Sequence, residues 1–242
     1  AAQNPFTKIA DRLGLPYNAQ ISWADSIMYL AGSRAPAHLE AEADAYIEQV
    51  IDRIHEAGLA GDDVAFSDFL APGNRWNPLL RQIIGQITSH DPENCSTVDS
   101  ARYVDEGGDF PVENGFGALV ARHAEGLPVT RSTPVSHVDW SGPHIRLDTP
   151  RGTITAGTII LAVPVNVLIA GAIRFTPALP AALVEAFHDC PMGVSEKLAI
   201  LLDRPIEGLG HLYGDVISPS RAPFNLHVNP FCLLYTSDAA DE

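Results

Sequence analysis

The sequence is poor in basic residues. Its 242 residues carry 15 lysines and arginines against 30 aspartates and glutamates, for a formal net charge of -15 at pH 7. Nucleic acids and anionic membrane surfaces both require a basic face on the protein that binds them. The basic residues do not cluster along this chain, so we expect neither kind of partner.

Ligands for metals are equally sparse. Cys95, Cys190 and Cys232 are far apart and form no CxxC pair, so the sequence predicts neither a zinc site nor a disulfide framework. The nine histidines, His123, His137 and His144 among them, have no HExxH or other paired-ligand spacing. We expect structural or exposed roles for them and no metal site. The cysteine usage favours a reducing, cytoplasmic compartment.

Long apolar runs are absent as well. The longest run, residues 158–173, is interrupted by Pro164 and Asn166 and is shorter than the roughly 20 residues that cross a bilayer. We therefore predict no membrane helix. The chain opens without an initiator methionine, so we expect either that a signal segment was removed or that the true N-terminus is absent.

Two motifs with clear chemistry do not occur. No GxSxG is present, which argues against a serine hydrolase with a nucleophile elbow. No GxGxxG is present either, so the βαβ unit that seats a dinucleotide pyrophosphate on a helix N-terminus is missing.

The first hundred residues contain helix signals. Asn4, Pro5 and Gly14 predict a short helix over residues 6–13. Apolar residues at helical spacing predict a long amphipathic helix after Pro36 that ends at Gly58, and another that begins at Pro78. We expect the acidic residues of the long helix to form a solvated face. These acidic residues are Glu40, Glu42, Asp44 and Glu48.

The pattern changes near Gly107. A helix over residues 118–125 is followed by alternating runs that predict an antiparallel meander over 135–140, 144–149 and 153–155. Residues 158–163 are apolar on both faces, which is typical of a buried strand in a parallel sheet, and Pro164 ends the run. A last helix is predicted over 180–188.

Lys197 is one of only two lysines in the chain. It precedes the apolar run 198–202, and a cation at the mouth of an apolar strand loses hydration unless a partner compensates for it. Lys197 is therefore our candidate catalytic residue. The alternative is a strand-end lysine whose ammonium reaches water.

The order of short segments from Gly107 onward resembles the flavin-containing amine oxidases. This family includes monoamine oxidases, polyamine oxidases and lysine-specific histone demethylases. The resemblance covers about residues 107–204 and lies in the order and spacing of eight segments. These are residues 112–120, 126–129, 133–135, 148–153, 158–164, 167–168, 173–180 and 193–197.

The resemblance implies a site for FAD. Val135 matches the valine whose backbone amide and carbonyl face the adenine, and Pro164 matches the segment that runs beside the flavin. Lys197 matches the lysine that holds a water near flavin N5, where an ammonium assists hydride acceptance and oxygen reduction.

The resemblance also implies a fold and a domain division. We expect a mixed α/β, two-domain amine oxidase fold that lacks the N-terminal Rossmann βαβ unit and the C-terminal flavin segment. Residues 1–106 would be the helical part of the substrate domain and 107–170 part of the FAD-binding domain. Residues 171–231 would belong to the substrate-domain sheet. Residues 232–242 read as the translation of a sequencing adapter, outside the natural protein.

The implied activity is oxidation of an amine. The amine would transfer a hydride equivalent to flavin N5, dioxygen would be the final acceptor, and the products would be an imine and peroxide. The fragment itself would be inactive. One alternative is a sister flavoprotein, such as a desaturase or a protoporphyrinogen-type oxidase, which needs no lysine at the flavin edge. Another is a non-catalytic scaffold without flavin. The sequence indicates neither the particular amine nor the oligomeric state.

Overall fold

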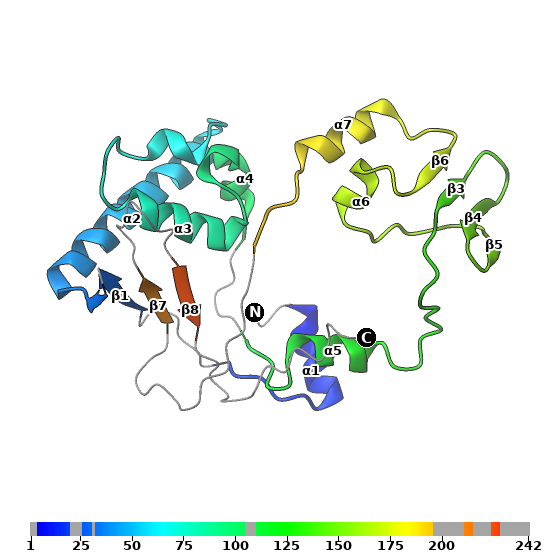
Figure 1. The fold of residues 1–242 in the computed structure, drawn as a ribbon, viewed down its shortest axis with the longest axis horizontal. Helices are drawn as coiled ribbons and strands as arrows, with labels where there is room; N and C mark the ends of the chain where they lie inside the picture. The colour runs from blue at the N-terminus through cyan, green and yellow to red at the C-terminus, as the bar shows by residue number, and fades with distance from the viewer. Residues whose placement is uncertain are drawn as a thin grey trace. The chain divides into compact units, whose positions relative to one another are not determined.

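A computed structural model describes residues 4–19, 26–30, 32–104, 110–195, 211–214 and 224–227. The chain divides into two compact units, the first made of Ala1–Glu125 with Ser195–Glu242 and the second of Gly126–Val194. Both contain helices and a four-stranded sheet (Figure 1). The mixed α and β character agrees with the predicted fold class.

The first helix, α1 (Pro5–Leu13), begins and ends where the sequence predicts. The Asn4 side chain accepts a hydrogen bond from the Phe6 amide at 2.9 Å, Pro5 occupies the first turn, and Gly14 ends the helix with φ 63°. Helix α5 (Phe116–His123) lies against α1, with Ala10, Leu15, Val112 and Leu119 buried between them. These helices form a small cluster of their own in the first unit.

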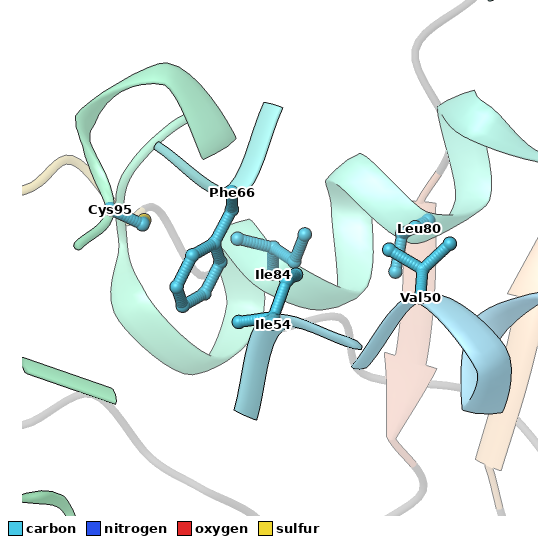
Figure 2. Close-up of a cluster of buried hydrophobic side chains, with 6 residues drawn as sticks. All are labelled: Val50, Ile54, Phe66, Leu80, Ile84 and Cys95. Atoms are coloured by element: carbon cyan, nitrogen blue, oxygen red, sulfur yellow. The ribbon is translucent and has the colours of Figure 1, made fainter. Parts of the chain in front are cut away.

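The main core of the first unit lies among the helices α2 (Ala37–Ala60), α3 (Asn77–Thr88) and α4 (Thr97–Arg102), with the short 3-10 helices η1 (Phe66–Phe69) and η2 (Pro92–Asn94) between them. Figure 2 shows six side chains of this core pointing toward one another. They are Val50, Ile54, Phe66, Leu80, Ile84 and Cys95. Burial of such side chains is the main stabilising term of this unit.

Helix α2 runs past the predicted end at Gly58. It continues to Ala60 and stops at Gly61, whose φ of 88° is left-handed. Gly58 instead lies inside the helix where the backbone of Thr97 approaches it, so close that no Cβ fits. The glycine therefore serves the packing of α2 on α4 and not the end of the helix.

The acidic face of α2 is only partly free in solvent. Glu42 accepts a hydrogen bond from the Trp76 indole at 2.8 Å and lies 3.7 Å from the Arg75 guanidinium. Glu40 accepts from the Met28 amide at 3.4 Å. Two of the four carboxylates predicted to be solvated thus tie α2 to neighbouring segments.

The sheet of the first unit has the order β2-β1-β7-β8. Strand β1 (Ser26–Leu30) pairs antiparallel with β2 (Ser33–Arg34) and parallel with β7 (His211–Gly214), which pairs antiparallel with β8 (Phe224–His227). Met28 of β1 packs with Ala43 of α2 and Leu79 of α3. The sequence predicted only helices in this part of the chain, so β1 was missed.

The sheet of the second unit has the order β5-β4-β3-β6. Its first three strands are the predicted meander, with β3 (His137–Asp139), β4 (Ile145–Thr149) and β5 (Gly152–Ala156) all antiparallel. Strand β6 (Arg174–Thr176) adds to β3 in parallel. Helices α6 (Val165–Ile169) and α7 (Ala181–Asp189) complete the unit, and α7 confirms the predicted helix.

Alternation gives this sheet an apolar face and a polar face. Phe175, Val138, Leu147 and Ile154 share a row across the four strands on one face. The register places eight polar residues on the other face. They are His137, Asp139, Arg146, Asp148, Thr153, Thr155, Arg174 and Thr176.

Residues 158–163 do not form the predicted buried strand. They belong to no strand or helix, and Ile160 is 91% exposed. Their apolar side chains would suit a central strand, but a central strand needs a hydrogen-bonded partner on each side. Within the described residues, the sheet of this unit consists of β3, β4, β5 and β6 and does not include this segment. The prediction of a buried strand is therefore wrong for this chain.

Among the described helices, none combines the length and apolar character needed to cross a bilayer.

Candidate functional site

Val135 lies two residues before β3, with its side chain half-buried. The next residue is held on both sides. The Ser136 amide donates to the Asp148 carbonyl at 2.9 Å, and the Ser136 carbonyl accepts from the Arg174 amide at 3.0 Å. Within the described part of the chain, the amide and carbonyl of Val135 itself have no hydrogen-bond partner.

This arrangement presents one donor and one acceptor from a single residue. A backbone N–H and C=O of the same residue in an extended segment can pair with a planar ligand edge that carries a complementary acceptor and donor. The pairing of Ser136 with β4 and β6 holds these groups in place. Val135 can therefore recognise a heteroaromatic edge through its backbone alone.

A polar network crosses the sheet next to Val135. The His137 ring has its Nδ1 3.1 Å from Asp148 Oδ2 and its Nε2 2.9 Å from Thr176 Oγ1. Thr153 Oγ1 donates to the other carboxylate oxygen of Asp148 at 3.0 Å. The hydrogen bond from His137, and after it that from Thr153, holds the pKa of the Asp148 carboxyl below its ordinary value.

Pro164 precedes α6 with φ -56° and ψ 143°, and its carbonyl accepts a hydrogen bond from the Val167 amide at 2.9 Å. It is exposed. Because proline has no amide hydrogen, the chain can turn into α6 here without leaving a donor unsatisfied.

The three predicted site residues are not all visible together. Lys197 lies outside the described residues. Val135 and Pro164 both belong to the second unit, but no hydrogen bond among the described residues joins them. The part of the chain that the structure describes also contains no group of three or more histidine, cysteine or acidic side chains able to hold a metal ion.

The sequence missed the network around His137. Alternation along two neighbouring strands already puts His137 and Asp148 on one face, and this signal could have been used. The parallel pairing of β6 with β3, which brings in Thr176 from 39 residues away, leaves no mark in the local sequence.

The sequence profile described as "Flavin containing amine oxidoreductase" matches residues 21–239, most of the chain. The chain belongs to this family. The match includes residues 232–239, part of the tail that the sequence predicts to be foreign, which lies outside the described residues.

The chain is also similar in sequence to individual proteins. Lysine-specific histone demethylase 2 of Homo sapiens is 32% identical over 87 residues, which are 36% of this chain and 11% of the relative. Polyamine oxidase 2 of Arabidopsis thaliana is 22% identical over 229 residues, covering 84% of this chain and 46% of the relative. The chain thus spans less than half the length of these relatives.

Solved structures share the fold. Wild-type putrescine oxidase bound to putrescine superposes with a TM-score of 0.58 at 21% identity, over 77% of this chain and 50% of that one. Cyclohexylamine oxidase from Brevibacterium oxydans gives a TM-score of 0.56 at 19% identity, over 77% and 49%. The chain therefore has the predicted mixed α/β amine oxidase fold. It corresponds to about half of each of these structures.

Proposed function

We propose that the protein is an FAD-dependent amine oxidase. It would oxidise an amine by hydride transfer to flavin N5, with dioxygen as final acceptor and an imine and peroxide as products. The observation that carries the proposal is the backbone of Val135. Its amide and carbonyl have no partner among the described residues, and they stand in a segment matched by the flavin amine oxidoreductase profile.

The residues present fit the adenine half of FAD. Adenine offers an amino donor beside ring-nitrogen acceptors, and this edge is complementary to one backbone carbonyl and one amide. The half-buried side chain of Val135 supplies apolar contact next to them. Pro164, without an amide hydrogen, suits a chain that passes close to the isoalloxazine ring.

Bound FAD would supply an acceptor for the hydride equivalent, with dioxygen as the final acceptor of the two electrons. The chain contributes binding and electrostatics. Val135 would orient the adenine, while the ammonium of Lys197 would hold a water at the flavin edge and stabilise negative charge that develops there. Lys197 is the residue that separates an amine oxidase from a desaturase-like relative.

The test uses the protein restored to the full length of its relatives and freed of flavin. FAD is titrated in, and the complex is mixed without oxygen with a panel of primary and secondary amines while flavin absorbance is followed. We expect bleaching by at least one amine and peroxide formation when oxygen is admitted.

Other outcomes would contradict the proposal in distinct ways. FAD uptake without bleaching by any amine would favour a desaturase or protoporphyrinogen-type oxidase. No FAD uptake at all would favour the flavin-free scaffold.

A further inference from the structure

His137 connects three strands of the second unit through both nitrogens of its ring. Nδ1 lies 3.1 Å from the carboxylate of Asp148 on β4, and Nε2 lies 2.9 Å from the hydroxyl of Thr176 on β6. Because a carboxylate only accepts, Nδ1 carries the hydrogen in that bond. The ring itself is about four-fifths covered, with 22% of the side chain exposed. We call the chain Asp148–His137–Thr176 the relay.

The relay suits both protonation states of the ring. A threonine hydroxyl donates to a neutral Nε2 and accepts from a protonated one, so the contact needs only a rotation of the hydroxyl. The other charged residues on this face of the sheet are Asp139 on β3, Arg146 on β4 and Arg174 on β6, while β5 presents threonines. Together with Asp148, this face therefore carries two carboxylates and two guanidiniums around the ring.

The same three strands hold the backbone next to Val135. Ser136 is bonded to the carbonyl of Asp148 on one side and to the amide of Arg174 on the other. Strand β6 is only three residues long. Beside the backbone bonds from Arg174 to Ser136 and from Trp140 to Thr176, the contact of the Thr176 hydroxyl with His137 fastens it to β3. A shift of β6 would move Ser136, and with it the amide and carbonyl of Val135.

We propose that the relay is a positioning device for the adenine-recognising backbone of Val135, and that it thereby sets the affinity for the adenine half of FAD. This inference rests on the proposed function. His137 and Thr176 act through Val135 and touch neither substrate nor flavin. The relay requires a histidine, an aspartate and a hydroxyl from three separate strands.

The test compares FAD with FMN, which lacks the adenine. Thr176→Val keeps the branched shape and removes the hydroxyl, whereas Thr176→Ser keeps the hydroxyl. The matched control is Thr155→Val. Thr155 is an exposed threonine on the same face of the sheet, and its hydroxyl makes no hydrogen bond with the relay residues. Dissociation constants are measured on the flavin-free, full-length protein by quenching of flavin fluorescence.

We expect Thr176→Val to weaken FAD binding about tenfold, the effect of one net hydrogen bond, and to leave FMN binding within about twofold. Thr176→Ser and Thr155→Val should bind both flavins as the unsubstituted protein does. His137→Gln provides a second route to the same selective loss. Thermal unfolding of each flavin-free variant shows whether it is folded.

A merely structural relay would give a different pattern. Equal weakening of FAD and FMN, or equal effects of Thr176→Val and Thr155→Val, would overturn the inference and leave the proposed function intact. If the unsubstituted full-length protein takes up no FAD, the proposed function and this inference fall together.

Discussion

Lys197 is the residue on which the proposed chemistry depends most. In the full-length enzyme, Lys197→Met should keep the length of the side chain and the binding of flavin while removing the ammonium. We expect flavin reduction or reoxidation to slow by about 10²-fold or more, as when one preorganised electrostatic group is lost. Stopped-flow absorbance under anaerobic and aerobic mixing measures the two half-reactions separately.

The only other lysine provides the control. Lys8 is exposed on α1, so Lys8→Met should leave both half-reactions unchanged. Wild-type rates for Lys197→Met as well would mark Lys197 as an ordinary strand-end lysine and would favour a desaturase-like or non-catalytic relative.

Asp148 gives a pH dependence with a definite sign. Its pKa is lowered in the fold, first by the hydrogen bond from His137. A carboxyl with a depressed pKa stabilises the fold above the unfolded value of about 4, and this contribution disappears as the pH falls through the folded pKa. Asp148→Asn should therefore lower the unfolding temperature near neutral pH, and the difference from the unsubstituted chain should shrink below about pH 4.

Asp44 supplies a control of opposite sign. Burial, and after it the charge of Glu40, raises the pKa of this carboxyl, so its ionised form is disfavoured in the fold. Asp44→Asn should raise the unfolding temperature near neutral pH and have little effect in acid. Thermal scans of both variants from about pH 2.5 to 7 check the two signs, and parallel curves would contradict the assignment.

At the scale of elements, the crossing of α2 and α4 depends on Gly58. Alanine is ordinarily about 0.5–1 kcal/mol better than glycine inside a helix. Here its Cβ would meet the carbonyl of Thr97, and a backbone group cannot move aside cheaply. Overpacking at this site should cost about 1–3 kcal/mol of stability, more than the alanine gains as a helix former. Gly58→Ala should therefore lower the free energy of unfolding of the first unit, measured in urea.

Gly85 of α3 is the matched case with space. The nearest atom to a Cβ there would be the carbonyl oxygen of His90 at 3.8 Å, an ordinary contact. Gly85→Ala should therefore stabilise by about 0.5–1 kcal/mol. If both alanines stabilise the chain, the close approach of Thr97 to α2 is not present in solution.

Two isoleucines test whether residues 158–163 are exposed and not part of a buried strand. Ile54 of α2 is 2% exposed and Ile160 is 91% exposed. Ile54→Ala should cost about 2–5 kcal/mol, as buried truncations do, whereas Ile160→Ala should stay within about 0.5 kcal/mol. Urea unfolding of the 242-residue chain measures both changes in stability. A large loss of stability in Ile160→Ala would mean that residues 158–163 form a buried strand after all.

At the scale of the whole molecule, the 242-residue chain should bind FAD poorly. In the proposed function Val135 would address only the adenine, and the sequence contains no GxGxxG to seat the pyrophosphate on a helix N-terminus. Flavin titration of this chain should show no stoichiometric complex. A resolved spectrum of bound flavin at one equivalent would contradict this and would require another phosphate site.

The sequence alone determined the features whose signals lie within a few neighbouring residues. Asn4, Pro5 and Gly14 fix the ends of α1 because a cap, a preset φ and a left-handed terminator act locally. Alternation likewise marked the meander that follows Val135, and the order of short segments indicated the family.

Only the tertiary structure decided the features that need a distant partner. Strand β1 exists by pairing with β7, about 185 residues away, Gly58 packs where a helix end was predicted, and Thr176 completes the relay by the parallel pairing of β6. Residues 158–163 have the composition of a buried strand, yet none of them is buried and five of the six are exposed, because burial is a property of a side chain and its neighbours together. Local sequence sets what a segment can form, and the neighbours that folding brings to it decide what it does form.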